Sequence, residues 1–157
     1  ENKNYAVYYT RTTDTYPSLT ERSQLANDVG ADYFLSCHIN SAGATAKGSE
    51  TLYNSQGYKA TNGSDFFYKW AANVHGFTKK ATGFTDRGLV NRTGLAVLRH
   101  TKTASTLTEF GFISNKTEAK SMKANTDKYG KAMFNSVVKM FQTKSIKKIR
   151  IIKEEQV

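Results

Sequence analysis

The stretch Phe34-Leu35-Ser36-Cys37-His38-Ile39-Asn40-Ser41 decides the fold and points to the site. Its apolar start is typical of a buried strand, and it delivers an imidazole and a carboxamide at its carboxyl end. A second strand, 105–113, carries one carboxylate, Glu109, among apolar neighbours. Open α/β sheets place their chemistry at the carboxyl ends of their strands. The two strands therefore predict a histidine and a glutamate at one edge of a sheet, which suits a hydrolytic metal site.

Strand alternation separates the polar side chains of the first strand from its cysteine. Ser36, His38 and Asn40 share one side, whereas Cys37 points to the other side and is interpreted as a core residue. Because Cys37 is the only cysteine, an intramolecular disulfide and a multi-thiolate zinc cluster are excluded. Two structural alternatives stay open: His38 as a hydrogen-bonded core histidine, and Glu109 as the partner of Arg87 or Arg99 in a salt bridge.

The remaining pattern alternates strands with helices. A capping box, Ser18 with Glu21, opens a helix over 18–29, and an aromatic stripe at helical spacing predicts a second helix over 64–80 that faces the core. Further helical segments are expected after Asn115 and over 129–141, and further strands over 6–10, 48–53 and 95–99. This order predicts an α/β fold, with a mainly parallel twisted sheet of about five or six strands and helices on both faces.

Composition indicates one domain of ordinary size. The chain has 157 residues, 38% of them hydrophobic, and a formal net charge of +10. A basic balance favours polyanionic partners such as nucleic acid, acidic lipid or anionic wall polymers, although a well-solvated basic surface explains it equally well. No apolar run is long enough to span a membrane. The tail 146–153 is interpreted first as a basic arm or linker, and second as an edge strand.

Several blocks, in order and at matching spacing, resemble one family from residue 5 to about 141. The blocks are Tyr9-Thr10-Arg11-x-x-Asp14, Ser18-Leu19-x-x-Arg22-x-x-x-Ala26-Asn27, Asp32-Tyr33-Phe34-Leu35-Ser36-x-His38-x-Asn40, Gly48-Ser49-Glu50-Thr51-Leu52-Tyr53, Asp86-Arg87-Gly88, Leu95-Ala96-Val97-Leu98-Arg99 and Leu107-Thr108-Glu109-Phe110-Gly111-Phe112-Ile113-Ser114-Asn115. They are similar to the zinc-dependent N-acetylmuramoyl-L-alanine amidases of the amidase-3 type, found in bacterial autolysins and phage endolysins.

The resemblance implies a peptidoglycan hydrolase that cuts the amide between N-acetylmuramic acid and L-alanine with zinc-activated water. It implies that His38 is a zinc ligand and Glu109 the catalytic general base. We expect Asn40, Glu50 and Arg87 to contact substrate, together with His100, which follows the predicted 95–99 strand. The implied partner is peptidoglycan, with anionic wall polymers as a further possibility and nucleic acid not expected. The implied location is the bacterial cell wall, reached by secretion or from a phage endolysin.

The chain departs from the family at its amino-terminal side. A Gly-His-Gly block with the first zinc histidine, and the zinc glutamate that follows it, have no counterpart in the sequence. We therefore expect residues 1–143 to be an N-terminally incomplete catalytic domain and 144–157 a basic linker or arm. The competing hypotheses are a fragment of an active amidase, which is favoured, a truly shortened protein, and a degenerate amidase that binds peptidoglycan without cutting it. As given, the chain is expected to be inactive, since catalytic zinc usually needs three protein ligands.

Overall fold

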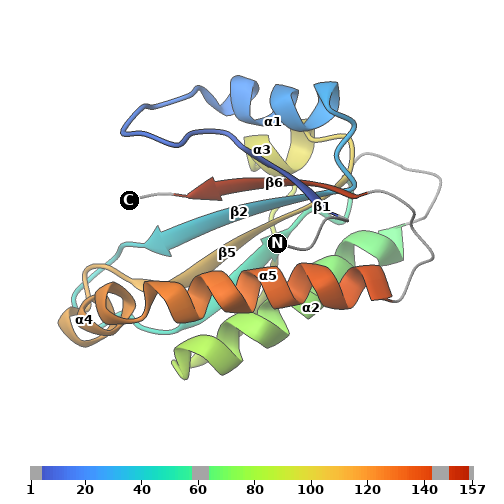
Figure 1. The fold of residues 1–157 in the computed structure, drawn as a ribbon. Coiled ribbons are helices and arrows are strands. Elements are labelled where there is room, and N and C mark those ends of the chain that lie inside the picture. The colour runs from blue at the N-terminus through green and yellow to red at the C-terminus, as the bar shows by residue number, and fades with distance from the viewer. Residues whose placement is uncertain (1–4, 58–63, 143–148, 156–157) are drawn as a thin grey trace.

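The structure, a computed structural model, describes residues 5–57, 64–142 and 149–155. Six strands form one sheet in the order β1-β6-β2-β5-β3-β4 (Figure 1). The strands are β1 (Tyr5–Tyr9), β2 (Tyr33–Asn40), β3 (Ser49–Tyr53), β4 (Asp86–Asn91), β5 (Ala104–Phe112) and β6 (Ile149–Glu155). The helices are α1 (Leu19–Asp28), α2 (Ser64–Thr82), α3 (Ala96–His100), α4 (Lys116–Ala124) and α5 (Thr126–Gln142). The predicted α/β class is confirmed.

Helices cover both faces of the sheet, as predicted. Figure 1 shows α1 and α3 over one face and α2 and α5 over the other. Alternating side chains of β2 divide between the two layers, because Phe34 packs in a cluster with Ala26 and Leu98, whereas Tyr33, Leu35 and Cys37 belong to the larger cluster under α2 and α5. The aromatic stripe of α2 is core, with Trp70 fully buried. The buried position of Cys37 agrees with its predicted role in the core.

The sheet is mainly parallel, with one change of direction that matters for the site. β1, β6, β2 and β5 run parallel to one another, whereas β3 pairs antiparallel with β5 and parallel with β4. The amino ends of β3 and β4 therefore lie at the same edge as the carboxyl ends of β2 and β5. Glu50 and Arg87 lie at this edge because they stand at the beginnings of β3 and β4, whereas His38 and Glu109 stand near the ends of β2 and β5.

The capping box predicted for the first helix is present. Glu21 N donates to Ser18 Oγ over 3.2 Å, and Ser18 N donates to Glu21 Oε2 over 2.7 Å. Gly30, which follows this helix, adopts a φ of 57°, a left-handed conformation that glycine reaches without a steric cost. Local chemistry alone was sufficient to predict both ends of α1.

Three expectations about secondary structure were wrong. Residues 95–99 were predicted as a strand, but they belong to the short helix α3. β4 was not predicted, because its sequence, Asp-Arg-Gly-Leu-Val-Asn, lacks an apolar alternation and contains Gly88 with a φ of 80°. The tail 146–153 was interpreted first as a basic arm or linker and second as an edge strand, but its described part belongs to β6, which lies inside the sheet between β1 and β2. Residues 143–148 of the expected tail lie outside the described residues, and the proposed domain division stays a prediction.

A buried carboxylate ties the loop before β3 to the end of β5. Glu118, on α4, accepts a hydrogen bond from Gly48 N over 2.8 Å and another from Phe112 N over 2.9 Å. Gly48 adopts a φ of 106°, and a Cβ there would lie 2.5 Å from Thr85 O, so the position requires glycine. Glu118 is 5% exposed. Its two hydrogen bonds hold the beginning of β3 against the end of β5, at the edge that carries the predicted site.

No helix within the described ranges is both long enough and apolar enough to cross a membrane.

Candidate active site

His38 and Glu109 meet at the sheet edge where the sequence predicted them. The two residues are register partners on the neighbouring parallel strands β2 and β5. Directly opposed residues of adjacent strands project from the same face, so the imidazole and the carboxylate lie side by side on the face covered by α1 and α3. The predicted adjacency is confirmed, while the catalytic and metal-binding roles stay predictions.

Glu50 extends this row onto a third strand. It is the register partner of Glu109 across the antiparallel pair of β3 and β5. Its carboxylate accepts a hydrogen bond from Arg87 Nε over 2.9 Å and one from Asn40 Nδ2 over 3.2 Å. The structure thus brings Asn40, Glu50 and Arg87 together with His38 and Glu109. The Arg87 guanidinium also lies 5.1 Å from the centroid of the Phe112 ring, a cation–π contact that restrains its position.

Within the described ranges, Glu109 forms no salt bridge with Arg87 or Arg99, the two partners considered for it. Arg87, one of the two expected partners, pairs with Glu50 instead. Glu109 Oε2 is buried and has no hydrogen-bond partner within the described part of the chain. Burial, and to a smaller extent the neighbouring charge of Glu50, raises the pKa of Glu109 to about 7. A carboxyl group with a pKa near neutrality can both accept and return a proton at physiological pH.

Replacing Glu109 with Gln should stabilise the metal-free fold at about pH 8 by about 2 kcal/mol, and should have little effect at about pH 4. The pKa of Glu109 is about 7 in the folded protein and 4.5 in an unstructured chain, so folding takes up a proton at pH values between these limits. Stability from this group therefore falls as the pH rises through that window, and the glutamine variant lacks the fall. Urea denaturation with a chelator present measures the difference. An equal effect of the substitution at both pH values would contradict the raised pKa.

His38 is poised as a neutral imidazole. Burial, together with the smaller effect of the positive charges of Arg22 and Arg11, lowers its pKa to about 4. A neutral imidazole has the free nitrogen lone pair that a metal ion requires. These two arginines were not assigned to the site from the sequence, although both lie in the blocks that carry the family resemblance. In the structure Arg22 is 2% exposed, and its Nε donates to Pro17 O over 2.8 Å.

The described residues do not by themselves complete a catalytic zinc site. Among them, no three His, Cys, Asp or Glu side chains are grouped so that they could hold a metal ion. His38 supplies one suitable imidazole, and Glu109 has a buried oxygen without a hydrogen-bond partner in the described ranges, but three protein ligands are usual for catalytic zinc. The fit is therefore partial, and no chemical step can be derived through zinc from these residues alone.

His75 serves the fold rather than the site. It is 6% exposed on α2, and its Nε2 lies 2.8 Å from Asp86 Oδ1 while its Nδ1 lies 3.2 Å from Thr51 Oγ1. Thr51 Oγ1 lies 3.1 Å from Thr108 Oγ1, so a buried chain of polar groups crosses from α2 through β3 to β5. These groups lie on the opposite face of the sheet from Glu50 and Glu109, which supports the interpretation of His75 as structural.

His100 is not brought together with the other predicted site residues. It ends α3, just before the amino end of β5, where Ala104 pairs with Tyr33. Asn27 Nδ2 donates to His100 O over 3.0 Å, which ties this point to the end of α1. The expectation that His100 faces the substrate groove followed from the strand predicted over 95–99. The placement of His100 at the other end of β5 does not support that role.

Comparisons with known proteins point to one family. Residues 1–139 match the family described as N-acetylmuramoyl-L-alanine amidase. The N-acetylmuramoyl-L-alanine amidase CwlM of Bacillus licheniformis is 36% identical over 125 residues, which are 80% of this chain and 46% of CwlM. The endolysin of Bacillus phage SPP1 is 36% identical over 124 residues, 77% of this chain and 44% of the endolysin. The chain thus spans about half the length of these curated relatives.

Solved structures show the same fold. The catalytic domain of CwlV, an N-acetylmuramoyl-L-alanine amidase from Bacillus (Paenibacillus) polymyxa, superposes with a TM-score of 0.78 at 28% identity, over 91% of this chain and 76% of that one. An N-acetylmuramoyl-L-alanine amidase from Clostridium difficile 630 gives a TM-score of 0.74 at 32% identity, over 86% of this chain and 71% of that one.

Proposed function

Because the chain belongs to the N-acetylmuramoyl-L-alanine amidase family, we propose that its His38–Glu109 edge takes part in hydrolysing the amide between N-acetylmuramic acid and L-alanine in peptidoglycan. The observation that carries the proposal is a buried carboxyl group with a pKa of about 7, placed beside a neutral imidazole on the adjacent strand. The substrate class follows from the family. A protein with this activity would act at the bacterial wall, after secretion or as a phage endolysin.

In the proposed reaction Glu109 carries the proton. Glu109 takes one proton from the attacking water as the water oxygen bonds to the amide carbon, and the carbon–nitrogen bond then breaks as Glu109 returns this proton to the departing nitrogen of L-alanine. The immediate products are a lactyl carboxylic acid and a free amine, so atoms and charges balance, and in water they ionise to a carboxylate and an ammonium group. Burial of Glu109 keeps its pKa in the range in which both transfers are feasible.

The remaining site residues would hold the substrate and tune Glu109. Glu50 is fixed by Arg87 and Asn40, so its negative charge stays next to Glu109 and favours the protonated form needed for the second transfer. The Arg87 side chain is 42% exposed beside this row and can donate hydrogen bonds to a polar group of the substrate. Bound zinc would polarise the amide carbonyl and lower the pKa of its bound water, with His38 as one of its ligands.

Activity on defined peptidoglycan tests the proposal. Incubation of the intact protein and zinc with purified peptidoglycan should release free amino groups on L-alanine, without new reducing sugars or other new amino termini. New reducing sugars would identify a glycosidase, and amino termini within the stem peptide would identify a peptidase. Either product pattern would contradict the proposed amidase.

Zinc binding provides a second measurement. In the intact protein, His38→Ala should weaken zinc binding by more than the roughly 10–100-fold typical of losing a group that only supports a ligand. His100→Ala is the matched control, since it removes the same side chain at the distant end of β5. Competition with a fluorescent chelator measures both affinities. Equal zinc affinities in the two variants would show that His38 is not a ligand.

A non-catalytic peptidoglycan-binding module is the second candidate. The observation that favours it is the absence, among the described residues, of three grouped metal ligands. Such a module would retain peptidoglycan at the Arg87 and Asn40 edge without cutting it. If the intact protein binds peptidoglycan but binds no zinc and releases no L-alanine amine, this function replaces the enzymatic one.

A further inference from the structure

Positive charge is concentrated on the helices at the carboxyl side of β5. From Lys116 to Gln142 the sequence holds six lysines and only two acidic residues, Glu118 and Asp127. Glu118 is buried and already accepts two backbone hydrogen bonds, so Asp127 is the only acidic side chain of α4 and α5 exposed to solvent. The excess charge of these two helices therefore faces solvent and is almost unopposed.

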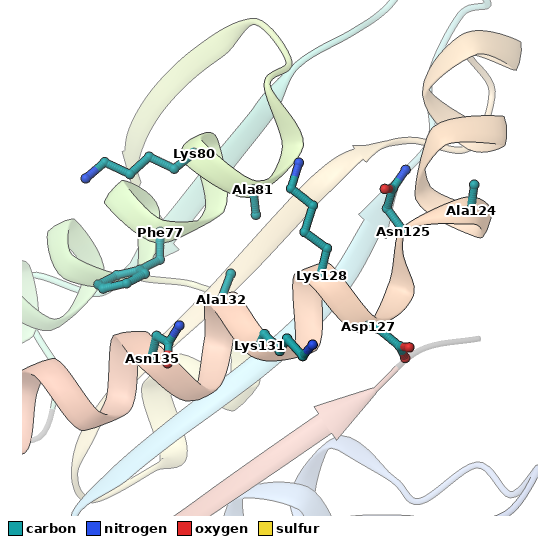
Figure 2. A pocket seen from close by; sticks show the side chains of 10 residues that line it. All are labelled: Phe77, Lys80, Ala81, Ala124, Asn125, Asp127, Lys128, Lys131, Ala132 and Asn135. Atoms are coloured by element: carbon teal, nitrogen blue, oxygen red, sulfur yellow. The ribbon is translucent and has the colours of Figure 1, made fainter.

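Part of this charge surrounds a hollow between α2 and α5. The hollow measures about 580 Å³, and Figure 2 shows Lys80 on α2 with Lys128 and Lys131 on α5 around it. Two side-chain amides, Asn125 and Asn135, add further polar groups to the lining. All three lysines are exposed, so their ammonium groups are available to a ligand. The lining therefore combines hydrogen-bond donors with a local excess of positive charge.

The hollow adjoins a second one on the same face of the sheet, beside α4 and α5. The second hollow measures about 940 Å³, shares Asp127 and Lys131 with the first, and includes both Lys123 and His38 in its lining. We use the name lysine surface for Lys80, Lys123, Lys128 and Lys131. This surface runs across the beginning of α5, on the face of the sheet opposite to the side chains of Glu109 and Glu50, so a ligand bound there does not cover those carboxylates.

We propose that the lysine surface binds a phosphodiester polymer of the bacterial wall, an anionic chain without bases. Lysine is a flexible point charge that pairs with phosphate, and successive ammonium groups along a hollow match a chain of repeating phosphates better than a single small anion. Proteins that bind single-stranded nucleic acid add aromatic platforms for the bases. Phe77, the aromatic residue that lines the first hollow, packs against the hydrophobic core instead.

The choice of a wall polymer, rather than another polyanion, rests on the proposed function at the wall. Such a polymer would keep the protein close to its insoluble substrate without contacts to the scissile amide. The two properties are separable, because polymer binding uses α2, α4 and α5, whereas Glu109 and Glu50 lie on the face of the sheet covered by α1 and α3.

Binding of a synthetic poly(glycerol phosphate) chain tests the proposal. The triple variant Lys80→Gln/Lys128→Gln/Lys131→Gln should bind this chain about tenfold more weakly at low ionic strength, as expected for the loss of three exposed ion pairs. The control Arg92→Gln/Lys102→Gln/Lys139→Gln removes the same net charge at other exposed positions and should change the affinity by less than about twofold. Fluorescence anisotropy of the labelled polymer provides the affinities, which should weaken as salt is added.

Two results would overturn the proposal. Equal losses in the two triple variants would show that binding depends on net charge and not on this surface, and tighter binding to single-stranded DNA at the same phosphate concentration would assign the surface to nucleic acid. Hydrolysis of peptidoglycan stripped of phosphodiester polymers is measured in parallel. It should be equal in the unsubstituted protein and the lysine variant, so failure of the amidase proposal appears in this assay while failure of the polymer proposal appears in the anisotropy.

Discussion

Glu109→Gln should lower the rate of amide hydrolysis by the intact protein about 1,000-fold, within the range that a positioned general acid or base contributes. Glutamine has nearly the same shape as glutamic acid but cannot accept a proton from water or return one to the departing amine. The variant removes the proton carrier and leaves the neighbouring His38 and Glu50 in place. The rate at which amino groups appear on L-alanine, with purified peptidoglycan as substrate, measures the loss.

Two controls show whether a lower rate comes from the loss of the proton carrier. Asp14→Asn removes a carboxylate from an exposed position outside the helices and strands and should leave the rate within about twofold of the original. The zinc content of Glu109→Gln should also be unchanged, because Glu109 is proposed to move a proton and not to hold the metal. If the variant keeps more than about a tenth of the rate, Glu109 is not the proton carrier. If it loses zinc, Glu109 is a ligand instead.

Glu118→Ala should destabilise the fold by about 3 kcal/mol, the second large effect, because it leaves the buried amides of Gly48 and Phe112 without their acceptor. Urea denaturation measures the free energy of unfolding, and Tm should fall by about 9 °C for a domain of this size. The glutamine variant retains one carbonyl oxygen that can accept a hydrogen bond, so its loss should be about half as large.

The matched control for this substitution is Glu21→Ala. Glu21 accepts a hydrogen bond from one backbone amide, Ser18 N, but it is exposed at the start of α1, where water can replace it. Its removal should therefore cost much less stability than the removal of Glu118. Equal losses of stability at the two positions would mean that the contacts of Glu118 with Gly48 and Phe112 contribute no more than a surface cap.

The centre of the site was predictable because it depends on local patterns. Two apolar strands that end in His38 and Glu109 were sufficient to predict that these side chains share one edge, since neighbouring parallel strands end together. The capping box at Ser18 and the aromatic stripe around Trp70 likewise predict a helix start and a buried helix face without reference to the rest of the fold. In each case the decisive interactions lie within one element or follow from its hydrophobic period.

The surroundings of Glu109 were less predictable because they depend on strand direction. The sequence 48–53 indicates a strand but not that β3 runs antiparallel to β5, and only this direction sets Glu50 opposite Glu109. The pairing of Arg87 with Glu50 depends in turn on β4, which has no apolar alternation to reveal it. Tertiary packing also decided the apolar segment 95–99, because a run this short is compatible with either a strand or a helix.

The buried hydroxyl groups behind the site have a consequence for how this edge of the sheet tolerates change. Slipping β3 by one residue along β5 would turn Glu50 to the opposite face and bring Thr51 into its place. Such a slip would also break the contact of Thr51 with Thr108, which lies 3.0 Å from Thr78 on α2. The contacts among these interior threonines therefore oppose sliding of β3 along β5, and they keep Glu50 in the register in which its charge raises the proton affinity of Glu109.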